Sequence, residues 1–160
     1  MSVEVCLRER TADHVVIYFQ KARSPEIRKW LPQQAQTLEQ ALEAYRRTLL
    51  PGATSFGRTI YADGVYVGDI WCYCIDPHET PNCMLSLCIF DGRYRSCGIG
   101  TQAVGLFVRE ILQRDRIRSI GAFSFADNAA SIRVLEKNGF RVLETFVEDA
   151  RESCYLQWES

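Results

Sequence analysis

Apolar and polar residues alternate along much of this chain, and the alternation predicts strands. Segments 55–62 and 65–75 follow this pattern and are joined at Asp63-Gly64, a dipeptide that favours the tight turn of a hairpin. An apolar run over 83–90 predicts another strand, ahead of a turn that contains glycine. In chain order, strands are predicted over residues 3–9, 55–62, 65–75, 83–90, 117–125, 140–148 and 153–158.

Helix signals occur in four other segments. Ser24-Pro25 is a favourable helix start, because serine can cap a helix and proline is tolerated at its first position. Thr37 to Gln40 resembles a capping box ahead of an apolar pattern with helical spacing. We therefore expect two helices after the first strand. Two more are predicted over about 99–114 and 128–138.

The order of these elements predicts an α+β fold, in which a hairpin meander leads into a strand, helix, strand unit. A chain of 160 residues with 47% apolar content is expected to form one domain over residues 1–160. The net charge of −1 and the absence of a basic run give no reason to expect a nucleic-acid partner. No long apolar segment or signal-peptide pattern occurs, so we expect no membrane association and a cytoplasmic location.

Seven cysteines raise the question of disulfides or a metal site. Their number is odd, no CxxC pair occurs and only two histidines are present, so we expect no bound metal. Cys72 and Cys74 lie two apart in a predicted strand, which places both thiols on one face as small packing residues. Cys97 lies beside Arg95 and a helix start, where a thiol is either reactive or simply a small residue in a turn.

The turn that carries two glycines is the first candidate for chemistry. It runs from Arg95 to Thr101 and joins the strand over 83–90 to the helix over 99–114. A side chain at Gly98 or Gly100 is expected to keep a bulky anion from the main chain, whereas glycine exposes the unpaired amides of the first helical turn. Each hydrogen bond to a charged group contributes about 1.5–3 kcal/mol, so several together can anchor a pyrophosphate.

A second constellation begins at Asn128. The helix that starts there is expected to end at Gly139, a residue suited to a left-handed C-terminal position. Asn128, Ser131 and Leu135 have the spacing of one helix face. That face can contact a ligand with amide groups, or Asn128 can simply cap the helix with Ser131 in solvent.

Together, the two segments resemble the GNAT superfamily of acyl-CoA-dependent N-acetyltransferases. The phosphate-loop pattern Q/R-x-x-G-x-G/A is matched by Arg95 to Gly100, and N-x-x-S-I-R-x-L-E-K-x-G-F is matched by Asn128 to Phe140. The second motif is most similar to the branch with ribosomal-protein N-terminal acetyltransferases and antibiotic-modifying relatives. The region around Trp30-Leu31-Pro32 is also similar to that branch, so the resemblance covers nearly the whole chain.

The resemblance implies a central, splayed, mostly antiparallel sheet of about six to seven strands with about four helices. The strands near 84–90 and 117–125 would part to admit the pantetheine arm of acetyl-CoA, the implied co-substrate. Lys137 or Arg93 would meet its 3′-phosphate. The implied cofactor-binding residues are Cys88, Ile89, Phe90, Arg95, Ser96, Cys97, Gly98, Ile99, Gly100, Thr101, Asn128, Ser131 and Lys137.

The resemblance also exposes a departure from the family. Many members carry a tyrosine where Leu135 stands and a glutamate where Met84 or Phe123 stands, and none of these three residues can exchange a proton. The catalytic residues therefore stay unassigned. A main-chain amide near Cys88 can still stabilise the oxyanion, and a CoA thiol leaves readily without an acid.

This absence of an evident base favours a weakly basic acceptor. A lysine amine needs about 4–5 kcal/mol to be neutral at pH 7, whereas an α-amine needs only about 1.4 kcal/mol. We expect a peptide N-terminus, an amino acid or a small amine as acceptor. The exception is a carboxylate that reaches the cleft through water, for which Asp69, Glu79 and Glu148 are candidates.

Two other functions stay open at this stage. A catalytically silent acyl-CoA-binding or sensing domain would keep the phosphate turn and Asn128 while lacking acid and base residues. A cysteine-based redox or metal protein is the third interpretation, although the thiols lack ligand spacing. The protein is expected to act as a monomer or homodimer.

Overall fold

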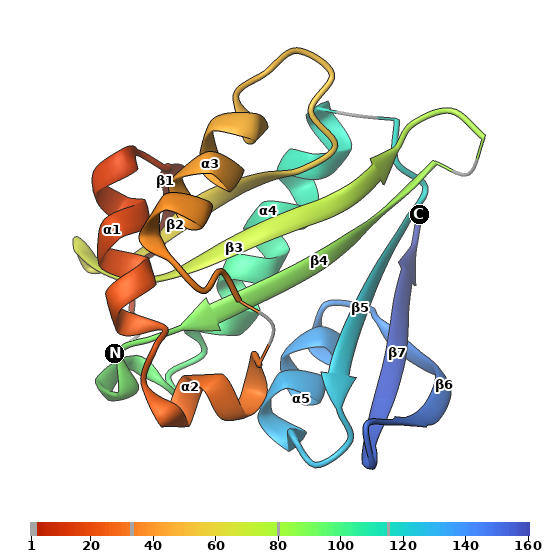
Figure 1. Ribbon diagram of the computed structural model, residues 1–160. Coiled ribbons are helices and arrows are strands. Elements are labelled where there is room, and N and C mark those ends of the chain that lie inside the picture. The colour runs from red at the N-terminus through yellow and green to blue at the C-terminus, as the bar shows by residue number, and fades with distance from the viewer. Residues whose placement is uncertain (1–2, 33, 80, 115) are drawn as a thin grey trace.

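One seven-stranded sheet organises the molecule, in the order β1-β2-β3-β4-β5-β7-β6 (Figure 1). The computed structural model describes residues 3–32, 34–79, 81–114 and 116–160. Adjacent strands are antiparallel except β4 and β5, which are parallel. The α+β class and the mostly antiparallel sheet are confirmed. The strands are β1 (Val5–Glu9), β2 (Phe56–Ala62), β3 (Val65–Asp76), β4 (Asn82–Ile89), β5 (Ser119–Phe125), β6 (Arg141–Glu148) and β7 (Arg151–Glu159).

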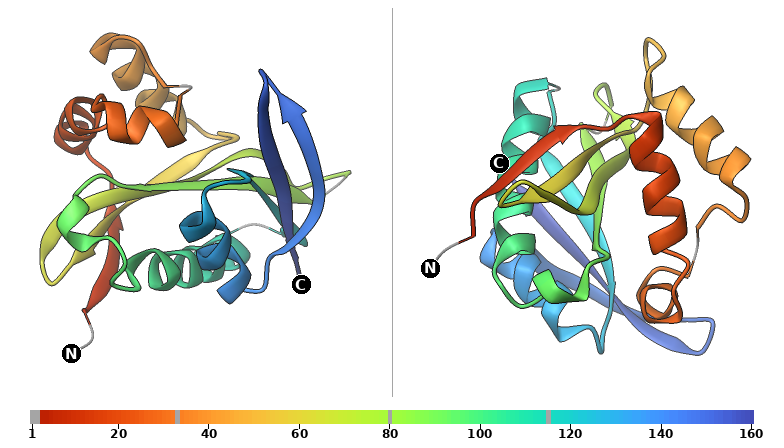
Figure 2. Two further views of the ribbon diagram at one scale, coloured as in Figure 1. Left: turned by 90° about the horizontal axis from the view of Figure 1, so that it is seen from below. Right: turned by 90° about the vertical axis from the view of Figure 1, so that its left-hand side faces the viewer.

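Helices cover both faces of the sheet. Figure 2 shows α1, α2 and α3 on one face and α4 and α5 on the other. Among the described residues, no helix is both long and apolar enough to cross a membrane. The helices are α1 (Ala12–Lys21), α2 (Pro25–Trp30), α3 (Leu38–Thr48), α4 (Ile99–Arg114) and α5 (Ala129–Lys137), with a short 3-10 turn, η1, at Gly92–Tyr94.

The expectation of two helices after the first strand is wrong, because α1 is a third. Its apolar residues form a continuous run from Val15 to Phe19, which hides the helical period. Its capping box is also unusual, since Nδ1 of His14 accepts the Thr11 amide at 3.1 Å where glutamate or glutamine is the common partner.

The main core lies between the sheet and α4. Phe107, Ile99 and Ile111 of α4 are buried against strand residues such as Ile70 and Leu85. A smaller cluster under α1 and α2 gathers Ala22, Ile27 and Cys88, with Trp71 and Phe90 packed against it. Both clusters meet on β4, so the core fixes this strand from its two faces.

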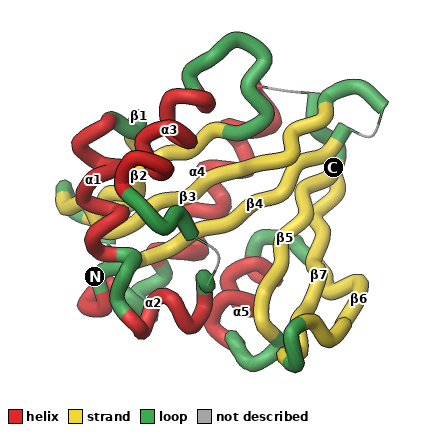
Figure 3. The backbone as a smooth tube through the Cα atoms, in the orientation of Figure 1, coloured by secondary structure: helices red, strands yellow, loops and turns green. Residues whose placement is uncertain are grey.

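Strands β4 and β5 pair only at their beginnings. Three residue pairs join them, from Asn82 with Ser119 to Met84 with Gly121. Beyond this point the two strands diverge, as Figure 3 shows, while β5 continues to pair with β7 as far as Phe125. The splayed sheet implied by the sequence resemblance is therefore present.

The two cysteines of β3 do not share a face. Cys72 is buried, but Cys74 is exposed and has a left-handed φ of 53°. The pairing of β3 with β4 is irregular between Tyr73 and Asp76, and this bulge reverses the alternation that the prediction assumed. No disulfide joins the seven cysteines, and four of them, namely Cys72, Cys83, Cys88 and Cys154, are buried.

A strained turn joins β6 to β7. Asp149 and Ala150 have φ values of 52° and 61°, in the left-handed region required at both central positions of a type I′ hairpin. Aspartate tolerates this region, whereas alanine pays a steric penalty because its Cβ approaches the carbonyl oxygen. The turn therefore holds Asp149 at the hairpin tip at the expense of stability.

Replacing Ala150 with glycine is expected to stabilise the protein by about 0.5–1 kcal/mol, because it relieves this strain. The control is Ala44→Gly in the exposed middle of α3, which is expected to cost about 1 kcal/mol. Urea unfolding of both variants gives the two differences. Equal destabilisation by both substitutions would show that the turn carries no strain.

Candidate functional site

The turn before α4 presents unpaired amides. Within the described part of the chain, the amides of residues 96–101 donate to no turn, loop or side-chain acceptor, and the first bond of the helix runs from the Gln102 amide to the Gly98 carbonyl at 3.1 Å. Gly98 has a φ of 77°, and a Cβ added there would meet open space. A left-handed residue in front of several free amides forms a concave site for an anion.

Gly100 serves a different purpose from the one expected. A Cβ at this position would lie 3.4 Å from Cγ2 of Val134 and 3.7 Å from Cδ1 of Leu87. The missing side chain therefore faces α5 and β4 and not the solvent in front of the turn. Gly100 permits close packing of α4, whereas a side chain at Gly98 would project into open space.

Arg95 braces the turn. Its Nε and Nη2 donate to the Ile89 carbonyl at 3.2 and 3.1 Å, and its Nη1 pairs with Glu26 of α2. The guanidinium thus ties the turn to the end of β4 and to α2. Ser96, with a φ of 61°, and Cys97, whose thiol donates to the Arg95 carbonyl at 3.4 Å, complete the exposed part of the turn.

The other two basic candidates lie on the surface. Arg93 is exposed and pairs with Asp91 at 2.8 Å, an interaction that lowers the pKa of the Asp91 carboxyl through hydrogen bonding. Lys137 is exposed in the last turn of α5. Of the two, Lys137 lies on the helix that packs against α4.

Along β4, the main-chain N–H and C=O groups of successive residues point alternately toward β3 and toward the opening beside β5. The Phe90 amide donates to the Val67 carbonyl at 3.0 Å, and the Cys88 carbonyl lies so close to Gly68 that a Cβ there would be 2.2 Å away. Both residues therefore direct these groups toward β3. Because strand residues alternate, the main-chain groups of Ile89 and Leu87 face the opposite side, where β5 has diverged.

In α5, Asn128 acts as the N-cap. Its Oδ1 accepts the Ser131 amide at 3.2 Å, and both residues are half-buried. Leu135, at the position where many relatives carry a tyrosine, is 2% exposed and belongs to the main core. The spacing correctly placed Asn128 and Ser131 in the first turn, and the cap uses one of the two polar groups of the Asn128 amide.

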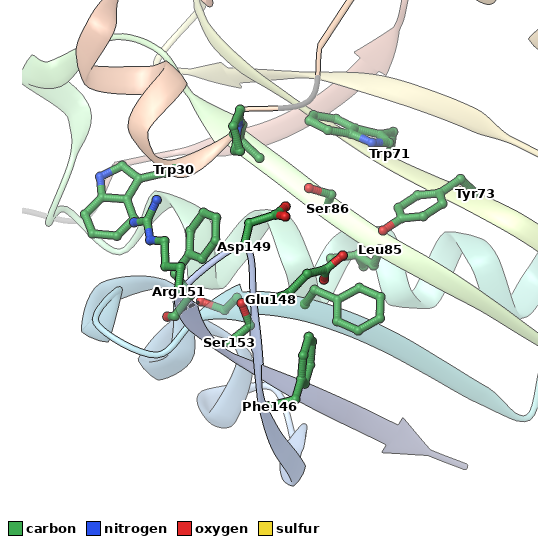
Figure 4. Close-up of a pocket in the computed structure, with 15 residues that line it drawn as sticks. Trp30, Trp71, Tyr73, Leu85, Ser86, Phe146, Glu148, Asp149, Arg151 and Ser153 are labelled. Atoms are coloured by element: carbon green, nitrogen blue, oxygen red, sulfur yellow. Dashed lines mark hydrogen bonds between the residues drawn. The ribbon is translucent and has the colours of Figure 1, made fainter.

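A cavity of about 750 Å³ opens where β4 and β5 part (Figure 4). It begins one residue beyond the last β4–β5 pair and extends to α2 and the β6–β7 hairpin. Phe123, one of the three positions without a proton-exchanging group, lies in its wall and is 57% exposed. The lining residues are Trp30, Leu31, Pro32, Trp71, Tyr73, Leu85, Ser86, Phe123, Ser124, Phe125, Phe146, Glu148, Asp149, Arg151 and Ser153.

Of the three carboxylates considered from sequence, only Glu148 lines this cavity. Asp69 lies on β3 outside the cavity lining and is fully buried, with its oxygens 2.6 Å from Arg10 Nη2 and from the Tyr66 hydroxyl. Burial raises the pKa of Asp69, and Arg10 opposes that rise. Asp69 therefore has a structural role as the partner of Arg10 and Tyr66, and this candidate carboxylate does not line the cavity. Glu79 is exposed in the loop between β3 and β4, outside the cavity lining.

Sequence reasoning missed several cavity residues. Asp149 lies in the turn between β6 and β7, and Arg151 is the first residue of β7. Trp71 and Tyr73 lie on β3, and in the sequence they indicated only a strand. Burial raises the pKa of Tyr73, so its hydroxyl stays protonated near neutral pH. Figure 4 shows the Tyr73 hydroxyl and the carboxylates of Glu148 and Asp149 directed into the space between the walls.

Metal and thiol chemistry find little support in this geometry. In the segments that the structure describes, no group of three or more His, Cys, Asp or Glu side chains could hold a metal ion. Burial raises the pKa of the Cys88 thiol to about 11, so the thiol beside the opening remains protonated.

Comparison with known proteins identifies the family. A profile of the acetyltransferase (GNAT) domain matches residues 4–141, so the chain belongs to the GNAT acetyltransferase family and is an acetyl-CoA-dependent acyltransferase. The resemblance seen in the sequence motifs is thereby confirmed. A search of curated protein sequences finds no significant match.

Solved structures share the fold at low sequence identity. Aminoglycoside acetyltransferase AAC(6')-Ib in complex with coenzyme A has a TM-score of 0.81 and 19% identity, with 98% of this chain and 95% of that chain covered. Spermidine N-acetyltransferase from Vibrio cholerae, in complex with CoA and spermine, has a TM-score of 0.85 and 10% identity, with 97% of this chain and 95% of that chain covered. RimL, a ribosomal L7/L12 alpha-N-protein acetyltransferase, has a TM-score of 0.80 and 16% identity, with 99% of this chain and 95% of that chain covered.

The Arg10–Asp69 pair generates a stability prediction. Arg10→Gln is expected to cost about 3–5 kcal/mol at pH 7, because it leaves a buried carboxylate without its cation. Without Arg10 the folded pKa of Asp69 rises further above its unfolded value. The protonated folded form is then favoured at low pH, and stability is lost as pH rises through the folded pKa.

Unfolding curves at pH 4 and pH 7 test this dependence, with Arg8→Gln on the exposed side of β1 as control. The difference between Arg10→Gln and the wild type should be smaller at pH 4. A penalty below 1 kcal/mol at pH 7 would contradict the structural role of the pair.

Proposed function

We propose that this protein transfers the acetyl group of acetyl-CoA to a primary amine held in the cavity between β4, α2 and the β6–β7 hairpin, with Glu148 as proton acceptor. The observation that carries the proposal is the order of features along β4. The cavity with carboxylates lies where β4 leaves β5, and the turn with free amides at Gly98 follows the C-terminal end of the same strand.

The amides from Ser96 to Thr101 would hold the pyrophosphate of acetyl-CoA, and Lys137 its 3′-phosphate. Arg95 positions this turn through the Ile89 carbonyl. The edge of β4 from Leu85 to Ile89, which does not pair with β5, spans about 14 Å at 3.4 Å per residue, and this length suits an extended pantetheine arm that pairs with the strand. Asn128 and Ser131 would face the arm from α5.

The bound co-substrate supplies an activated thioester, and the residues of the cavity supply orientation and proton transfer. An amine must be neutral to attack, which requires a proton acceptor or an acceptor with a low amine pKa. Glu148 lines the cavity from β6 and can accept this proton through one water. Main-chain amides of β4 that face the opening would stabilise the oxyanion, and the Tyr73 hydroxyl would donate a hydrogen bond within the cavity.

The acceptor class follows from this arrangement. A peptide N-terminus, an amino acid or a small amine fits an open cavity of about 750 Å³. We also propose that the protein acts in the cytoplasm, as a monomer or homodimer, and the lack of disulfides among its seven cysteines is consistent with a reducing compartment.

Gly98→Ala is expected to weaken coenzyme A binding about 10-fold or more, because a methyl group would stand in front of the amides and a left-handed φ would be lost. The matched control is Gly64→Ala in the β2–β3 turn, which has a similar φ of 81° and open space around it. Both substitutions are expected to reduce stability by a similar amount. A difference in coenzyme A affinity, measured by calorimetric titration, would therefore reflect binding at Gly98 and not a general loss of stability. Equal affinity in both would refute phosphate binding at this turn.

Glu148→Gln is expected to lower kcat about 100-fold near neutral pH while leaving coenzyme A affinity unchanged, because the amide has the shape of the carboxylate but accepts no proton. Glu152→Gln, on the same hairpin but outside the cavity, should retain full activity. Unaltered kcat in Glu148→Gln would remove this residue from the mechanism. Tight coenzyme A binding by the wild type without acetyl transfer to any amine would instead favour a silent acyl-CoA-binding domain.

A further inference from the structure

The described residues that line the cavity include one cationic side chain, Arg151, and two carboxylates, Glu148 and Asp149, and these groups differ in how free they are to bind a ligand. Arg151 donates to the Lys29 carbonyl at 2.8 Å, and its guanidinium carbon lies 3.4 Å from the centre of the Phe125 ring and 5.3 Å from that of Trp30. It also lies 3.6 Å from Asp127. This cation is held by groups that the protein supplies, so it is a poor partner for an anion on a ligand.

The two carboxylates are in the opposite situation. Among the described residues, no cationic side chain lies within ion-pair distance of Glu148 or Asp149. Both side chains line the cavity, and Figure 4 shows them directed into it from the hairpin. The left-handed turn at Asp149 and Ala150 fixes the second carboxylate on a hairpin and not on a loose loop. Strain retained at such a position is typical of functional sites.

The remaining walls also favour positive charge. Trp71 and Tyr73 of β3 line the cavity together with Phe123 and Phe146, and the rings of Phe123 and Phe146 meet edge to face with centroids 6.0 Å apart. Aromatic faces attract ammonium groups and repel carboxylates. Aromatic walls with two unpaired carboxylates therefore match a ligand with two cationic groups.

On the basis of the proposed function, we propose that the acceptor carries a second positive charge close to the reacting amine and no carboxylate beside it. One carboxylate, Glu148, takes the proton of the attacking amine, and Asp149 with the aromatic walls holds the second cation. The proposal narrows the acceptor class. It excludes free amino acids and favours a diamine or a peptide N-terminus followed by a basic side chain.

Acceptor pairs that differ only in the second charge test this inference. We expect kcat/KM for peptides beginning Ala-Lys to exceed that for Ala-Gln at least 10-fold, with Ala-Glu lower still. 1,4-Diaminobutane should exceed 4-amino-1-butanol by a similar factor when rates are expressed per concentration of neutral amine. The two arms separate a peptide source of the dication from a small-molecule source.

Asp149→Asn should reduce the preference for the charged acceptors to less than 3-fold, and high salt should reduce it in the wild type. Glu152→Gln should keep the wild-type preference, and thermal unfolding confirms that each variant is folded. Equal kcat/KM for charged and neutral acceptors would overturn this inference while leaving the acetyltransferase function intact. Acetylation of none of these amines by a protein that binds coenzyme A would overturn the proposed function itself.

Discussion

The early separation of β4 from β5 is the constraint on which the rest of the structure depends. Gly121 marks the last pair, and a Cβ there would lie 2.7 Å from the Tyr155 ring and 2.8 Å from Sδ of Met84. Large side chains thus fill the apex of the opening, and β5 follows β7 instead of β4. Beyond Met84, β4 has no strand partner among the described residues on the side of β5. Arg95 contacts the Ile89 carbonyl there, and a strand-like ligand arm can pair with the other main-chain groups.

The two sequence motifs, Arg95 to Gly100 and Asn128 to Phe140, also contain residues that pack α4 against α5. Asn138, inside the second motif, donates to the Thr101 carbonyl at 3.1 Å and to the Val134 carbonyl at 2.9 Å, and so ties α5 to α4. Gly100 allows the same two helices to approach. Each motif therefore contains a residue that packs α4 against α5, which explains why the motif spacing was informative about the fold.

Local signals predicted what local interactions decide. The Asp63-Gly64 hairpin, the capping box at Thr37 and the apolar face of α4 each depend on neighbours within a few residues, and each was found where expected. By contrast, α1 was hidden by a continuous apolar run, and the bulge at Cys74 depends on pairing with β4. The role of Asp69 could not be read from its neighbours, because its partner Arg10 lies 59 residues earlier. The cavity was the least predictable part, since its walls come from α2, β3, β4, β5 and the β6–β7 hairpin.

Arg151 links the first third of the chain to its last hairpin by joining the C-terminal end of α2 to the start of β7. The amide turn at Gly98 belongs to neither of these segments. Mutations in the hairpin can therefore reshape the cavity walls without touching the amide turn, whereas α2 contacts that turn through the pair of Glu26 with Arg95. Because the cavity walls and the amide turn come largely from different segments, substitutions can change which amine the cavity accepts while the turn that would bind acetyl-CoA stays the same.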